Sequence, residues 1–121
     1  MKALPFVVVD GVRKKCSPQE ATHIEIHIPG PSGRMALPVM LHGTREGTPN
    51  WTWNGSEESP TLRPSVLTQG TRYNGKDPAD KANWPAFRCH TWVTNGQAQF
   101  LDDCSHELKG QTVDLINLER E

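Results

Sequence analysis

The chain has no long hydrophobic run and no strong excess of charge. No apolar stretch approaches the ~20 residues that a transmembrane helix needs, and the opening "MKALPFVVVDGVRKK" is too short and too soon charged for a secretory signal. Lysine and arginine number 13 against 14 acidic residues, and the net charge of −1 gives no general attraction to nucleic acid or anionic lipid. We therefore expect a cytoplasmic protein with no membrane partner and no nucleic-acid partner.

Cysteine and hydrophobic residues are also scarce. Three cysteines, an odd number, fit a disulfide framework poorly and a reducing compartment well. A hydrophobic content of 35% with ten glycines and ten prolines favours turn-rich β structure over a helical bundle. A chain of 121 residues has room for one core. The expected fold is mainly β (all-β or α+β), one small domain over residues 1–121, built from antiparallel hairpins with long Trp-containing loops.

Hydrophobic patterning predicts where the strands lie. "THIEIHI" (22–28) alternates strictly between isoleucine and polar residues, as a half-buried strand does. Segment 13–21 is polar, with Ser17 as a possible helix start, and segment 42–81 is loop-like. The expected strands, each bounded by turn residues, are 4–11, 22–28, 34–41, 87–94, 97–103 and 111–118.

Three tryptophans occur within residues 50–84, a segment otherwise rich in turn residues. Rings of this size do not stay in water without cause, so the segment is expected to be packed. One interpretation is an aromatic cover on a small core. The other is a binding surface for a nucleotide, a sugar or a partner protein, formed by Trp51, Trp53, Asn54 and Arg63.

The stretch "FRCHTWVTNGQAQFLDD" (87–103) has the strongest short-range hairpin signal, a two-residue Asn-Gly turn. Such a turn pairs Thr94 with Gln97, and alternation then places Cys89 and Cys104 on one face of the hairpin, with His90 on the other.

His106 can swing to the same point, so Cys89, Cys104 and His106 form a candidate zinc site. His90 on a bulged strand, His42, Asp102 or water could supply a fourth ligand. The alternatives are a reduced cysteine pair buried in the core and a redox or nucleophilic cysteine.

Four segments carry a family likeness: "WTWNGS" (51–56), "PTLRPSVL" (60–67), "RCHTWVTNGQAQFLDDCSH" (88–106) and "LKGQTVDL" (108–115). The chain thereby resembles domain-of-unknown-function family 6527, small proteins of bacteria and bacteriophages, some of which carry an "ammonia monooxygenase" label that a chain of this size without a span does not support. The resemblance implies a compact, zinc-binding domain encoded in phage or prophage genomes. Relatives often have a Cys-Pro-x-Cys turn where this chain has Pro29 and Ser32, so part of a thiolate cage is missing here.

No complete set of catalytic residues is apparent in the sequence, so no catalytic residue is expected. The leading hypothesis is therefore a zinc-stabilised phage or prophage accessory protein that binds a host protein in the host-cell cytoplasm, as a counter-defence or host-takeover factor, without catalysis. The alternative is a metal-dependent hydrolase or nucleotide-processing enzyme with the Cys/Cys/His ligands and Asp102, Asp103 or Glu107 as base. A nucleotide- or sugar-binding module that uses the tryptophan surface is the third hypothesis.

Overall fold

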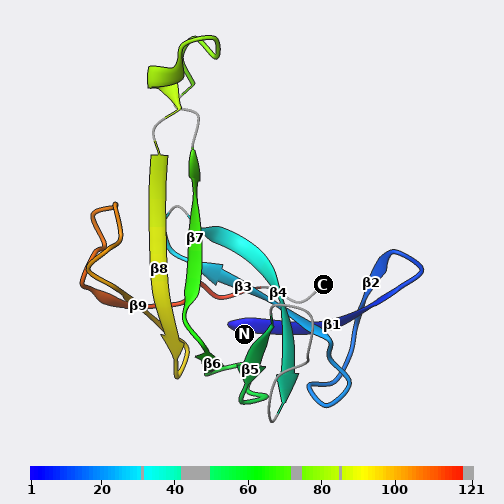
Figure 1. The fold of residues 1–121 in the computed structure, drawn as a ribbon. Coiled ribbons are helices and arrows are strands. Elements are labelled where there is room, and N and C mark those ends of the chain that lie inside the picture. The colour runs from blue at the N-terminus through cyan, green and yellow to red at the C-terminus, as the bar shows by residue number, and fades with distance from the viewer. Residues whose placement is uncertain (31, 42–49, 72–74, 85, 119–121) are drawn as a thin grey trace.

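The computed structural model describes residues 1–30, 32–41, 50–71, 75–84 and 86–118. Within them the chain forms two β-sheets whose strands cross (Figure 1), which confirms the expected mainly β fold. The first sheet has the order β2-β1-β3-β4-β5-β6 and the second β10-β9-β8-β7. The strands of the first sheet are β1 (Ala3–Val9), β2 (Val12–Lys15), β3 (His23–Ile28), β4 (Gly33–Leu41), β5 (Trp51–Trp53) and β6 (Leu62–Arg63). Those of the second are β7 (Val66–Thr71), β8 (Ala86–Thr94), β9 (Gln97–Phe100) and β10 (Thr112–Asp114).

The first sheet starts with a hairpin of β1 and β2. Asp10 and Gly11 join these strands with φ angles of 52° and 77°, the left-handed pair of a tight hairpin turn. The polar segment 13–21 was expected to contain a helix start at Ser17, and this is wrong, because its first residues pair with β1 as an exposed edge strand and residues 18–20 form a turn. In β3 the isoleucines are buried and the polar residues are half-buried, as the alternation predicts.

The expected loop 42–81 is the largest error in the sequence-based assignment. It contains β5, β6 and β7, as well as the first residue of the short 3-10 helix η1 (Lys81–Asn83). β5 lies parallel to β4, with Val39 opposite Trp51, and β6 completes the edge of the first sheet. Between β6 and β7 the chain passes from the first sheet to the second, and Pro64 and Ser65 form this crossing.

The β8–β9 hairpin has the expected register. Thr94 pairs with Gln97 and Thr91 with Phe100, and Asn95 and Gly96 have φ angles of 50° and 77°. β9 ends at Phe100, earlier than expected, and residues 101–111 form a loop that returns to β8. The last strand is also shorter than the predicted range 111–118.

The core lies between the two sheets. Side chains from both sheets contribute to it, and the cluster includes Ile24, Ile26, Ile28, Leu37, Val39, Trp53, Cys89, Val93, Phe100 and Cys104. Alternation along β8 directs Cys89, Thr91 and Val93 into this core, each with no exposed surface. Their neighbours Arg88, His90 and Trp92 lie on the outer face. Among the described residues, no helix is long and apolar enough to cross a membrane.

Candidate active site and metal centre

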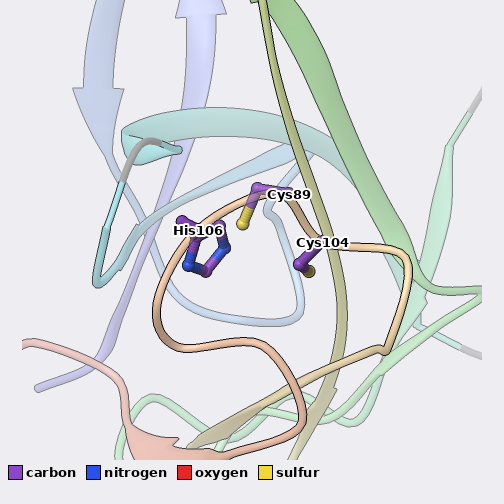
Figure 2. A group of neighbouring side chains, drawn as sticks. All are labelled: Cys89, Cys104 and His106. Carbon is purple, nitrogen blue, oxygen red and sulfur yellow. The ribbon is translucent and has the colours of Figure 1, made fainter.

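Two cysteines and a histidine come together on the core side of β8. Cys89 belongs to this strand, while Cys104 and His106 belong to the loop that follows β9 (Figure 2). Their possible ligand atoms all lie within 4.8 Å of one another, and both cysteines are buried and free of disulfides. The expected meeting of these three residues is therefore confirmed, and the group can hold a metal ion.

The surroundings of this group fit a metal. Burial raises the pKa of the Cys104 thiol, with the neighbouring Cys89 acting in the same direction, so this thiol stays protonated unless a cation draws the proton off. Burial lowers the pKa of His106, which favours the neutral imidazole that binds metals. Among the described residues, His106 Nε2 and Ser32 Oγ are buried polar atoms without a hydrogen-bond partner, an arrangement that costs free energy unless a ligand is present.

The other residues considered as metal ligands are placed differently. His90 is outside the group of three, because its side chain lies on the opposite face of β8. Asp102 is also outside it, and His42 lies outside the described residues. Ser32 occupies one position where the resemblance implied a cysteine. It belongs to the turn before β4, and a side chain at Gly30 in the same turn would lie 3.7 Å from the His106 ring.

On the outer face of β8, three residues form a hydrogen-bonded relay. The Ser65 hydroxyl lies 2.7 Å from His90 Nε2. The other ring nitrogen, Nδ1, lies 3.1 Å from Asp103 Oδ2 and 3.3 Å from Oδ1. A hydroxyl, an imidazole and a carboxylate in this order are the constellation of a serine hydrolase, which is recognised by geometry and not by sequence order.

The backbone explains why these three meet. Leu67 of β7 is opposite His90, so the two side chains share the outer face, and Ser65 lies two residues before Leu67. At the edge of β8 that pairs with β9, away from β7, the Leu101 N–H donates a hydrogen bond of 2.9 Å to the His90 carbonyl. This bond holds the loop after β9 against β8. Asp103 follows in this loop and reaches the imidazole from the side opposite Ser65.

The residues expected to form a binding surface support this crossing. The Trp51 indole donates to the Ser65 carbonyl at 3.3 Å. Arg63 donates to the Val93 carbonyl at 3.1 Å and lies over the ring of Trp92. These contacts attach the chain on either side of Pro64 to β5 and β8.

The other two members of that expected surface make contacts within the protein. Trp53 is almost fully buried and donates to the Ser56 carbonyl. The Asn54 side chain accepts hydrogen bonds from the backbone N–H groups of Ser56 and Thr61. Trp53 therefore belongs to the core, and Asn54 orders the turn between β5 and β6.

The relay lies at the surface of the described part of the chain. The His90 and Asp103 side chains are 27% and 43% exposed, and Arg88 Nη1 lies 3.6 Å from Asp103 Oδ2. Leu67, beside His90, is 47% exposed. A hollow of about 510 Å³ lies elsewhere, over the first sheet, and includes none of these residues. The open position of the relay suits a large substrate better than an enclosed small molecule.

Sequence reasoning missed Ser65 and its contact with His90. No G-x-S-x-G turn marks this serine, and 25 positions separate it from the histidine. Asp103 was considered as a base for metal chemistry, as an acceptor that holds a histidine tautomer beside the metal, and as an ordinary turn residue. The available signal was the alternation along the hairpin, which places the His90 side chain on the outer face of the strand. A histidine in that position can contact a serine and an aspartate from neighbouring segments.

Comparison with protein families identifies the chain. The model of a family described as "Bacterial ubiquitination-like system serine protease (BubE)" matches residues 19–101, well over half of the chain. The chain belongs to this family. Ser65 and His90 lie inside the matched range, and Asp103 follows just after it. No curated protein and no solved structure matches the chain.

This membership corrects several expectations. The assignment to domain-of-unknown-function family 6527 is wrong, and so are the phage or prophage accessory role, the viral and counter-defence functions and the absence of catalysis, because the matching family is one of bacterial serine proteases. The sequence analysis considered only cysteine nucleophiles and metal-bound water, and Ser65 lies in a segment that was expected to be a loop.

Proposed function

We propose that this protein is a serine protease in which Ser65 is the nucleophile, His90 the general base and Asp103 the residue that orients the imidazole. The observation that carries the proposal is the continuous relay from the Ser65 hydroxyl through both ring nitrogens of His90 to the Asp103 carboxylate. Membership of a serine protease family supports the same chemistry independently.

The geometry suggests how each residue acts. Ser65 Oγ attacks the scissile carbonyl carbon while its proton passes to His90 Nε2. The imidazolium then gives that proton to the leaving amine, and an acyl group remains on Ser65. Water, deprotonated by the same nitrogen, then attacks the acyl carbon; the bond to Ser65 Oγ breaks, Nε2 returns the proton to that oxygen, and the acyl group leaves as a carboxylic acid that ionises in water. Throughout, Asp103 accepts a hydrogen bond from the Nδ1 proton, which keeps Nε2 free to act as the base and stabilises the transient cation.

The substrate we propose is a polypeptide of a ubiquitination-like system. The family's description names such a system, and the open surface around the relay supports a macromolecular substrate. β7 begins directly after Ser65, and among the described elements it is paired with β8 alone. An extended chain can add to such an open strand edge and bring its carbonyl to the serine. The free cysteines support a cytoplasmic location, which is part of this proposal.

We further propose that the metal held by Cys89, Cys104 and His106 is zinc and that its role is structural. Two thiolates and an imidazole are ligands that favour zinc, which adds stability to the fold where it binds. The orphaned hydroxyl of Ser32 is a candidate for the remaining polar contact, in place of a cysteine. The metal would lie on the core side of β8, so the proton transfers between Ser65 and His90 do not involve it.

Fluorophosphonate labelling tests the proposed protease chemistry. The Ser65 oxygen would displace fluoride from phosphorus and lose its proton to His90, which leaves one phosphonyl group on the protein. Mass spectrometry should locate this group on Ser65, and both Ser65→Ala and His90→Ala should prevent its addition. Ser17→Ala is the matched control, since Ser17 is exposed and lies between β2 and β3 of the first sheet, and it should label normally. Labelling that persists in Ser65→Ala would contradict the assignment.

A further inference from the structure

Two pairs of residues adjacent in sequence each contribute one residue to the metal group and one to the relay. In the first pair, Cys89 faces the core and His90 faces outward. In the second, Cys104 is buried beside Cys89 while Asp103 lies at the surface beside His90. The metal group and the relay are therefore back to back, with only the backbone of β8 and of the following loop between them.

Direct contacts join the two sites. Cys104 Sγ accepts a hydrogen bond from the His90 backbone N–H at 3.1 Å and lies 3.2 Å from the His90 carbonyl oxygen. The next residue, Ser105, donates its N–H to the Arg88 carbonyl at 2.9 Å, and its hydroxyl accepts from the Arg88 N–H at 2.7 Å. The segment that contains Asp103 is thus attached to the part of β8 that contains His90, and a metal ligand is one of the attachment points.

We propose that Cys89 and Cys104 are positioning residues of the protease: the metal that they hold with His106 fixes the 101–106 loop to β8 and thereby keeps Asp103 within hydrogen-bond distance of His90. This inference rests on the proposed function and adds to it a dependence of catalysis on a metal that takes no part in the reaction.

The loop needs such a fixed point. Residues 101–106 form no strand, and the Asp103 side chain is 43% exposed, so water competes for its hydrogen bond to the imidazole. Without metal, the inner side of the loop is held by the hydrogen bond from the His90 N–H to Cys104 Sγ, and His106 Nε2 has no partner among the described residues. A metal would join Cys89 of β8 to Cys104 and His106, which follow directly after Asp103 in the loop.

The experiment compares metal-loaded and metal-free protein in two backgrounds. Zinc is removed with a chelator and restored by adding zinc alone, and the rate of fluorophosphonate labelling is measured in the wild type and in Asp103→Ala. A displacement of a catalytic group by about 1 Å lowers the reaction rate by roughly 100-fold. We expect a loss of that order in the wild type, recovered with zinc, and almost no further loss in Asp103→Ala, where the contact that the metal protects is already absent. Equal losses in both backgrounds would overturn the proposal, and so would no loss in the wild type.

A second readout does not depend on activity. The Nδ1 proton of an imidazole bonded to a carboxylate gives a strongly downfield proton resonance, which His90→Ala would assign. This resonance should weaken or vanish when zinc is removed and return when it is restored. Its persistence in folded, metal-free protein would overturn the coupling. If the loaded protein never labels at Ser65, the proposed function fails, and this resonance still decides whether the metal positions Asp103.

Cysteine variants separate the metal ligands from thiols in general. Cys89→Ser should reduce zinc content and labelling rate together, whereas Cys16→Ser should change neither, because Cys16 lies outside the group of three. If Cys89→Ser does not fold, Cys104→His keeps a metal-binding side chain at that position, and its labelling rate should follow its zinc content. Full labelling by a folded variant that binds no zinc would contradict the inference.

Discussion

The two faces of β8 differ in what holds their functional residues in place. On the inner face, Cys89 and Cys104 are buried in the core, where neighbouring side chains fix them. On the outer face, His90 and Asp103 are 27% and 43% exposed and depend on a few polar contacts. The buried face supplies rigidity and the exposed face supplies access for a substrate. This difference agrees with the proposal that the buried group directly behind the relay holds its exposed residues in place.

Removal of the His90 imidazole should cause the largest loss of labelling rate with a small loss of stability. His90→Ala removes the base, and the loss of a base of this kind costs roughly 10⁴-fold or more in rate. Stability should change by less than about 1 kcal/mol, because the side chain is partly exposed and outside the core. Fluorophosphonate labelling and urea unfolding measure the two effects. A large loss of stability with labelling retained would mean that His90 supports the fold and not the labelling reaction.

A change at the inner face should affect both stability and catalysis. Cys89→Ser places a hydroxyl in the core and removes a metal ligand, and we expect a loss of about 2–4 kcal/mol in unfolding free energy. The labelling rate should also fall, by roughly 100-fold through misplacement of Asp103. Zinc analysis, urea unfolding and labelling are measured on one preparation, with Cys16→Ser as the control. A variant that is destabilised but labels at the normal rate would show that the faces act independently.

Loss of the hydrogen bond from Trp51 of β5 to the Ser65 carbonyl should have an intermediate effect on the labelling rate. Trp51→Phe keeps most of the ring and removes the indole N–H that donates to the Ser65 carbonyl. The loss of one such hydrogen bond is worth about 1 kcal/mol, roughly a fivefold change in labelling rate. Trp53→Phe is the matched variant, since its indole bonds to Ser56 and not to Ser65. It should lower stability more than labelling, and the opposite order would contradict a positioning role for Trp51.

The smallest effect on the labelling rate is expected for Arg88, which contacts the relay only at Asp103. Arg88→Ala removes a cation 3.6 Å from Asp103 Oδ2, and both side chains of this pair are nearly half exposed. Solvent screens such pairs, so the change should cost less than about 1 kcal/mol, or a factor of about five in labelling. This loss should shrink further at high salt. A loss comparable to that of His90→Ala would mean that Arg88 acts directly in the chemistry.

The hairpin and the thiol pair could be predicted from the sequence because local rules determine them. Asn95 and Gly96 define a tight turn, the turn sets the register, and alternation then places Cys89 on the core side. Trp51 and Trp53 also marked the middle segment as packed and lie on one strand, β5, but β6 and β7 were not foreseen. Strictly alternating isoleucines defined β3 in the same way.

The serine could not be predicted in this way. Its position depends on β7 joining the second sheet beside β8, a pairing between distant segments, and the residues around Ser65 are mostly turn formers that read as loop. Asp103 depends on the loop that replaces the expected end of β9, where the ladder stops at Phe100. Both placements follow from tertiary contacts that no local pattern contains.

A crystal structure of the fluorophosphonate-treated protein, with anomalous scattering recorded at the zinc edge, tests the central claim most directly. The account predicts a phosphonyl group on Ser65 Oγ next to His90, and one zinc bound by Cys89, Cys104 and His106 on the opposite side of β8. A phosphonyl group on another residue, or a zinc ion between Ser65 and His90, would contradict it.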